Sequence, residues 1–227
     1  MNQLILKGYQ IGDKNGGPTA LAKIFNQSLV TCNGFNKNDL VKRYQNWWDN
    51  GAFDTGPTFA MVFTKISNGV PVKDAAKAIN KKLNGKTAGC GPAHRIAPLS
   101  SFFKIQINTM IKIAREESKI THYHPDAGNC SAVMALLCRY LLKGHTWCES
   151  KELVSKCKDI DDIWIKIQNA SLNNDGHVLN VMHSALYFLE RSRPVEKSIE
   201  FAGPSNYCPI IVGIIQSIIN SQNNLIH

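Results

Sequence analysis

The sequence has 227 residues, of which 44% are hydrophobic, and this is enough for one sizeable core. We expect a single domain over residues 1–227. No apolar stretch approaches the roughly 20 residues that a bilayer-spanning helix needs, so the sequence excludes a membrane protein. The formal net charge is +9. That charge alone would allow a nucleic-acid partner, but the lysines are scattered along the chain without a run of five or six, which argues against one.

The cysteine content indicates a reduced compartment. Seven cysteines is an odd number, and no pair has the spacing of zinc ligands. The first residues, MNQLILKGYQIGD, lack the basic start and apolar core of a signal peptide. We therefore expect a cytoplasmic protein whose cysteines are small core hydrophobes.

Helical periodicity runs along nearly the whole chain. Residues 18–31 place Leu21, Ile24, Phe25 and Leu29 on one face, and Pro18 suits the first turn. The same pattern predicts helices over 40–48, 57–66, 72–83, 107–117, 128–144, 160–170, 176–190 and 208–220. The segments 128–144 and 208–220 are apolar on most sides, which is typical of central, buried helices. No stretch alternates as a strand would, so the sequence predicts an all-α, multi-helix bundle.

Five polar segments between these helices share an unusual composition. They are GDKNGGPT (12–19), FDTGPT (53–58), AGCGPAHR (88–95), THYHPDAGN (121–129) and FAGPSNYCP (201–209). Glycine-rich loops at helix N-termini present backbone N–H groups and a positive dipole end, which suits phosphates and other anions. Several on one bundle would form a composite pocket. The alternative is that each is only a capped turn.

Taken together, these segments resemble the ADP-ribosylglycohydrolase family, in the same order from Gly12 to about Gly213. YQIGDKNGG is similar to the opening GDALG segment, and FDTGPT is similar to TDDT in one branch and DIGPTT in another. AGCGPAHRIAPL resembles GNGALMRIAPL, and SKITHYHP resembles SxLTHxHP. FAGPSNYCPIIVG lies where the family carries GGDADTxAAIxGAL. The resemblance implies the helical fold of that family.

The departures concern the metal site. The resemblance implies two magnesium ions held by the TDDT and DADT clusters. Here these clusters correspond to residues 55–58 and 204–207, which contain no aspartate. Hard divalent cations need negatively charged oxygen ligands, so we expect no metal ligands and no cofactor, although the resemblance alone would imply magnesium.

Two carboxylates remain in the loops, Asp13 and Asp54, and we expect them to be catalytic. A carboxylate can activate water or stabilise an oxocarbenium-like state. The alternative for Asp13 is a turn cap, and for Asp54 an N-cap or Asx turn.

The other loop residues supply candidate substrate-binding groups. These are Gly12, Asn15, Gly16, Thr55, Gly56, Thr58, Cys90, Gly91, His94, Arg95, His122, His124, Asn206 and Tyr207. Arg95 would clamp a diphosphate, or pair structurally with a carboxylate. His122 and His124 would bind ligand, or pack at a helix entry. Cys90, with His94 four residues on, is a better candidate nucleophile than Cys208, but a cysteine nucleophile needs a lowered pKa and we favour neither.

The resemblance and the residues together predict a hydrolase that cleaves an ADP-ribosyl, or related ribosyl, N- or O-glycosidic bond without the usual dimagnesium centre. Its partner would be ADP-ribose or an ADP-ribosylated acceptor. One alternative is a non-catalytic module that binds ADP-ribose or a nucleotide, and another is a structural role, as in the J1-type crystallins of this family.

Overall fold

The computed structural model describes residues 1–13 and 16–223, and it confirms the all-α prediction. The helices are α1 (Gln3–Gly12), α2 (Gly17–Thr31), α3 (Lys37–Asp49), α4 (Pro57–Ser67), α5 (Val72–Lys82), α6 (Gly91–Arg95), α7 (Ile107–Ser118), α8 (Pro125–Leu142), α9 (Trp147–Ser155), α10 (Asp161–Gln168), α11 (Val178–Glu190), α12 (Val195–Ala202) and α13 (Cys208–Asn223), with a 3-10 helix, η1, at Ala97–Ser101. The described residues contain an isolated bridge between Gly89 and His177 but no strand.

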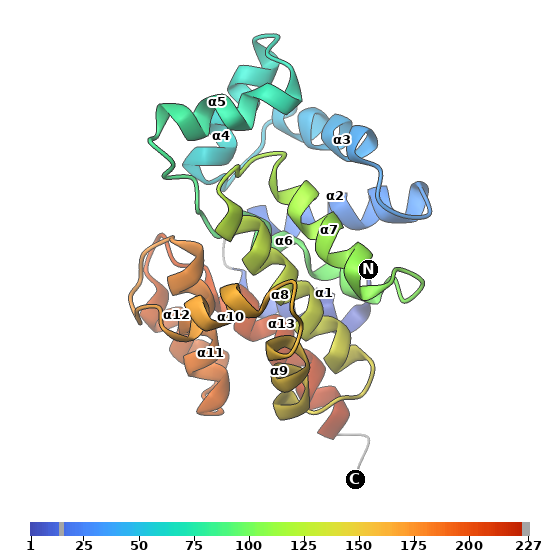
Figure 1. Cartoon of the computed structure of the whole chain (residues 1–227), viewed down its shortest axis with the longest axis vertical. Helices are drawn as coiled ribbons and strands as arrows, with labels where there is room; N and C mark the ends of the chain where they lie inside the picture. Colours follow the sequence, from blue (N-terminus) through green and yellow to red (C-terminus); the bar gives the residue numbers. More distant parts are fainter. Residues whose placement is uncertain (14–15, 224–227) are drawn as a thin grey trace.

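The helices are arranged around three central ones. Helices α1, α8 and α13 occupy the middle of the molecule, α3, α4 and α5 gather at one end, and α9 to α12 gather on the other side (Figure 1). Helix α8 is buried along most of its length, as its apolar sequence predicts. A large main core joins most of the helices, and Val62, Ala75, Ala76 and Ile79 form a small second core between α4 and α5.

All nine segments with the helical period form helices, and the structure adds α1, α6, α9 and α12, which the periodicity did not predict. Helix α1 buries Ile5, Gly8, Tyr9 and Gly12, which is a regular helical stripe whose signal is weakened because two members are glycines. Helix α9 begins with a capping box between Thr146 and Glu149. Among the described residues, no helix combines the length and apolar character that a bilayer crossing requires.

The glycines of α1 allow it to lie directly against α13. A Cβ on Gly12 would lie 2.2 Å from the carbonyl oxygen of Pro209, and a Cβ on Gly8 would lie 2.3 Å from the Cα of Ile214. On the other side, a Cβ on Gly213 would lie 2.5 Å from the carbonyl oxygen of Gly8. The backbones of the two helices are therefore in contact. This contact places the C-terminal end of α1 beside the N-terminal end of α13.

Candidate functional site

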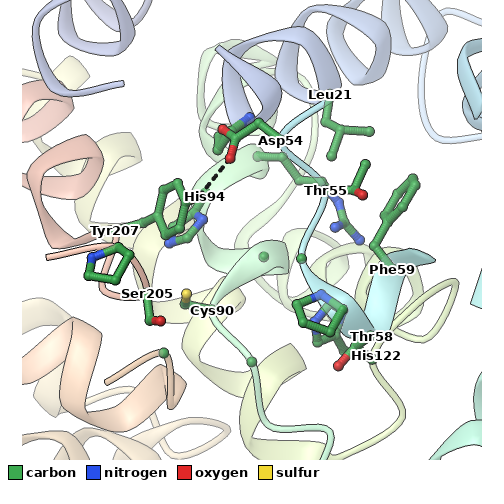
Figure 2. Close-up of a pocket in the computed structure, with 18 residues that line it drawn as sticks. Leu21, Asp54, Thr55, Thr58, Phe59, Cys90, His94, His122, Ser205 and Tyr207 are labelled. Atoms are coloured by element: carbon green, nitrogen blue, oxygen red, sulfur yellow. Dashed lines mark hydrogen bonds between the residues drawn. The ribbon is translucent and has the colours of Figure 1, made fainter. Parts of the chain in front are cut away.

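A cavity of about 460 Å³ lies where the five polar segments, or the helices they lead into, come together (Figure 2). Its size falls within the usual range for small-molecule sites. The predicted site residues that line it are Asp54, Thr55, Gly56, Thr58, Cys90, Gly91, His94, Arg95, His122 and Tyr207. The sequence segments are far apart, and the helix packing brings these ten residues to one place.

Asp54 is held at the edge of the cavity by two donors. The hydroxyl of Tyr207 donates to Oδ1 at 2.7 Å, and the backbone N–H of Gly17 donates to Oδ2 at 3.3 Å. A Cβ on Gly17 would lie 2.5 Å from the carbonyl oxygen of Asp54, so only glycine lets α2 start this close. Asp54 itself has a left-handed backbone with φ of 49°. The carboxylate thus ties together the segments that precede α2, α4 and α13.

His94 lies beside Tyr207 on the cavity wall. The two ring centroids are 5.2 Å apart, and His94 is 3% exposed (Figure 2). Burial, with a contribution from the nearby charge of Arg95, lowers the pKa of His94 to about 3. Its Nε2 atom is buried and has no hydrogen-bond partner among the described residues. A neutral imidazole with an unused nitrogen is suited to a hydrogen bond with a ligand.

Arg95 is committed to the protein. Its Nε donates to Glu117 Oε1 at 2.6 Å, and the two side chains are 1% and 0% exposed. Burial opposes the charge of Arg95, but Glu117 and Tyr44 raise its pKa above the ordinary value. The hydroxyl of Tyr44 also donates to Glu117 Oε1, at 2.9 Å. The structural pairing that the sequence left open is therefore present, and the charge of Arg95 is compensated.

A hydrogen-bond chain extends from Arg95 to His122. Arg95 Nη2 donates to Thr121 Oγ1 at 2.8 Å, and Thr121 Oγ1 lies 2.7 Å from His122 Nδ1. Burial, followed by the charge of Arg95, lowers the pKa of His122 well below its ordinary value. The His122 ring lies against Gly89 and Gly91, which have no side chain to obstruct it. A Cβ on Gly89 would lie 2.9 Å from the ring atom Nε2, and a Cβ on Gly91 would lie 3.2 Å from Cε1. Both glycines therefore make room for a fixed, neutral imidazole.

The two candidate nucleophiles, Cys90 and Cys208, are thiols and not thiolates. Burial raises the pKa of both Cys90 and Cys208 to about 12. An activated cysteine needs the opposite shift, so neither has the property of a nucleophile. Cys208 packs in the core at the start of α13.

Five other predicted site residues lie outside the cavity lining. The carboxylate of Asp13 accepts bonds from the backbone N–H groups of Gly16 and Thr19, at 3.0 and 2.8 Å, and so caps the first turn of α2. Asn206 Oδ1 accepts from the N–H of Cys208 at 2.9 Å and caps α13. His124 is the N-cap of α8, where its Nδ1 accepts from the N–H of Asp126 at 3.2 Å.

Gly12 and Gly16 have backbone roles. Gly12 makes the close contact of α1 with α13, and Gly16 has φ of 87° at the N-cap of α2. Asn15 lies outside the described residues. The structure therefore gives Asp13, Asn206, His124, Gly12 and Gly16 a structural function, and these five residues do not line the cavity.

Several lining residues escaped the sequence prediction. Leu21 and Phe59 form apolar parts of the cavity wall. Gly176 and Ser205 also line the cavity and lie close together, since a Cβ on Gly176 would lie 3.1 Å from the Ser205 carbonyl oxygen. Pro18, Pro57, Gly89 and Pro204 complete the lining. Leu21 lies on the apolar face that the sequence predicts for residues 18–31, and Phe59 lies in the helix predicted over 57–66. The turn sequence NNDG before His177 was the one signal for Gly176.

The charge of the lining is simple. Asp54 is its one carboxylate among the described residues, and Arg95, its one permanent cation there, is neutralised by Glu117. Within the described chain, no cluster of three or more His, Cys, Asp and Glu side chains has the arrangement of a metal site.

Comparison with known proteins identifies the class. The family model described as ADP-ribosylglycohydrolase matches residues 16–207, so the chain belongs to the ADP-ribosylglycohydrolase family. Among solved structures, the chain is similar to one described as "ADP-ribosylglycohydrolase-related protein complex", with a TM-score of 0.65. The two are 20% identical over 89% of this chain and 70% of that chain, a level that establishes the fold alone. A comparison with curated protein sequences gives no significant match.

Proposed function

We propose that this protein is a hydrolase that cleaves an ADP-ribosyl, or related ribosyl, N- or O-glycosidic bond, and that Asp54 is its catalytic carboxylate. Membership of a family of glycohydrolases supports the reaction class. The observation that carries the assignment of Asp54 is its isolation: it is the one uncompensated charge among the described residues of the cavity lining.

Asp54 has the hydrogen bonding of a proton acceptor. Tyr207 and Gly17 both donate to it, and each carboxylate oxygen keeps a further lone pair. As the bond from C1′ to the leaving group breaks, positive charge develops on the ribose ring, and a nearby carboxylate stabilises it. Water then adds to C1′ and gives one proton to Asp54, which passes that proton to the leaving nitrogen or oxygen and becomes a carboxylate again.

Neutral groups would hold the substrate. We infer that His94, His122, Thr55 and Thr58 make hydrogen bonds to the ribosyl hydroxyls, since they line the cavity and the two imidazoles stay uncharged at neutral pH. Leu21 and Phe59 would cover apolar surface of the ligand. Arg95 would act through Thr121 on the orientation of His122 and would not clamp a phosphate.

The donor set does not fit the two magnesium ions that the family resemblance implies. Such a centre needs several carboxylate oxygens, and this lining offers Asp54 alone, with both of its oxygens already accepting hydrogen bonds. The proposed reaction therefore uses no metal ion.

The test is a hydrolysis assay on ADP-ribosylated arginine, serine and nucleic-acid ends, with magnesium and with a chelator. Asp54→Asn keeps the shape and removes the charge, and we expect turnover to fall about 100- to 10,000-fold. The matched control is Asp159→Asn, which changes an exposed carboxylate outside the cavity lining. Unchanged turnover in Asp54→Asn would refute the assignment, and strict magnesium dependence would refute the metal inference.

A second candidate function is a non-catalytic module that binds ADP-ribose or a nucleotide. It is favoured by the fact that both oxygens of Asp54 are already engaged by protein donors. Isothermal titration with ADP-ribose separates the two: binding without turnover on any of the three conjugates would favour the binding module.

A further inference from the structure

The end of the molecule formed by α3, α4 and α5 carries most of the net positive charge. Residues 36–87 make up less than a quarter of the chain, yet they contain nine Lys and Arg against four Asp and no Glu. Their net charge of +5 is more than half of the +9 of the whole chain. The positive charge is therefore concentrated in one continuous segment of the chain, although no run of five or six lysines occurs in it.

Three of these lysines form a stripe on α5. Lys73, Lys77 and Lys81 are exposed and follow one another at four-residue intervals, which places them about 6 Å apart along the helix axis. The opposite side of α5 is buried through Ala75, Ala76 and Ile79, so the stripe faces solvent. Figure 1 shows α5 at the outer end of the molecule.

The stripe has little local compensation. Lys73, Lys77 and Lys81 form no ion pair with any described residue. The one acid of α5 is Asp74. Elsewhere in this end of the molecule, Asp39 is paired with Arg43, Asp49 accepts a hydrogen bond from Gln45, and Asp54 is engaged at the cavity.

A groove continues the stripe toward α3. It has a volume of about 460 Å³ and is lined by Lys37, Asn38, Val41, Lys42, Val72 and Lys73. None of these described residues is acidic, and Lys37 alone has an ion-pair partner, Glu116 at 3.2 Å. Lys73 belongs to both the groove and the stripe, so the two form one continuous surface, which we call the α3–α5 basic surface.

We propose that the α3–α5 basic surface binds the sugar-phosphate backbone of a single-stranded nucleic acid. Regularly spaced lysines match a linear polyanion better than a compact anion, because each can neutralise a separate phosphate and release its counterions. The groove adds groups that suit a sugar-phosphate backbone: an amide at Asn38 for phosphate or sugar oxygens, and apolar contacts at Val41 and Val72 for the sugars. This surface is distinct from the cavity lining, so the proposal does not depend on the proposed hydrolase activity.

The experiment measures anisotropy of a labelled, mixed-sequence, single-stranded DNA of about 20 nucleotides, a length that exceeds the usual single-strand site size. Titrations run from about 50 to about 200 mM salt. The test variant is Lys73→Gln/Lys77→Gln/Lys81→Gln. We expect at least about a 10-fold loss of affinity at the lowest salt, and a slope of log K against log salt that is shallower by about 2, since each lost contact on a single strand contributes about 0.7.

The matched control is Lys112→Gln/Lys143→Gln/Lys158→Gln, which removes the same charge from exposed lysines without ion pairs among the described residues. Circular dichroism of both variants confirms that they fold. An affinity in the control close to that of the unmodified protein supports the proposal. Equal loss in both variants, no binding of the unmodified protein at the lowest salt, or equal competition by poly-glutamate would overturn it.

Discussion

Asp13 and Asp54 occupy similar settings in the sequence, because each lies in a short loop with glycine and proline before a helix. The structure separates them. Asp13 accepts hydrogen bonds from the first turn of α2, which follows it directly, whereas Asp54 accepts from Tyr207, far away in the chain. The first pattern is that of a cap and the second assembles a cavity. For these two carboxylates, the distance along the chain to the hydrogen-bond donor separates the cap from the residue that lines the cavity.

The same division runs through the remaining loop residues. Asn206 and His124 serve helices that begin one or two residues later. His94 and His122 instead line the cavity with neutral rings. A remote partner does not by itself mark a ligand-binding residue, since Arg95 forms a structural pair with the distant Glu117, and Asn206 also donates to the backbone oxygen of Asn173 at 2.9 Å.

Substitution of Arg95 should have the largest effect on stability, and it tests whether Arg95 is a structural residue or a ligand-binding residue. Arg95→Met would leave the fully buried Glu117 without its counter-charge, and we expect the free energy of unfolding to fall by about 3 to 5 kcal/mol. Urea denaturation at neutral pH measures it. The double variant Arg95→Met/Glu117→Gln should recover part of the loss. If Arg95→Met kept its stability and lost only ADP-ribose binding, Arg95 would belong to the ligand-binding group.

The buried imidazoles of His94 and His122 should make the free energy of unfolding fall at acidic pH. The pKa of His94, about 3 in the fold, lies below the ordinary value of 6.5. The unfolded chain therefore binds a proton between these values that the folded chain does not. The contribution of His94 is intact above pH about 6.5, and below it the free energy of unfolding should fall by about 1.4 kcal/mol per pH unit, down to pH about 3.

His122 adds to this fall in the same direction, because its pKa is also lowered. Urea denaturation at several pH values would show a shallower dependence in His94→Met than in the unmodified protein. The exposed His177→Asn serves as a control that keeps a cap acceptor at α11. An identical pH dependence in His94→Met and the unmodified protein would mean that His94 is not a buried, neutral group.

The smallest effect concerns Asp13. Asp13→Ala removes the acceptor for Gly16 and Thr19, and loss of a cap should lower the free energy of unfolding by about 1 kcal/mol. Turnover per folded molecule should stay unchanged, in contrast to Asp54→Asn. If Asp13→Ala lost turnover under conditions in which it is fully folded, Asp13 would have the catalytic role that the sequence predicts.

The helices could be predicted because their signal is local. A buried stripe such as that of residues 18–31 is visible in the sequence, and even the stripe of α1 is regular once glycine is counted as a packing residue. The site was predictable only in part. That Asp54, Cys90, His122 and Tyr207 converge follows from the packing of distant helices, and nothing in the sequence near Arg95 indicates that Glu117 is its partner. The excess of Lys and Arg over residues 36–87, by contrast, is visible in the sequence itself.

The contact between α1 and α13 has a consequence for the cavity. Gly12 directly precedes Asp13, and Pro209 lies two residues after Tyr207, so the contact joins the segments that carry these two residues. A single methyl group at Gly12 would collide with the Pro209 carbonyl oxygen and force that point open. The spacing between the helix that Asp13 caps and the tyrosine that holds Asp54 would then widen. Gly12 thus helps to set the distance between α2 and Tyr207, although it does not line the cavity.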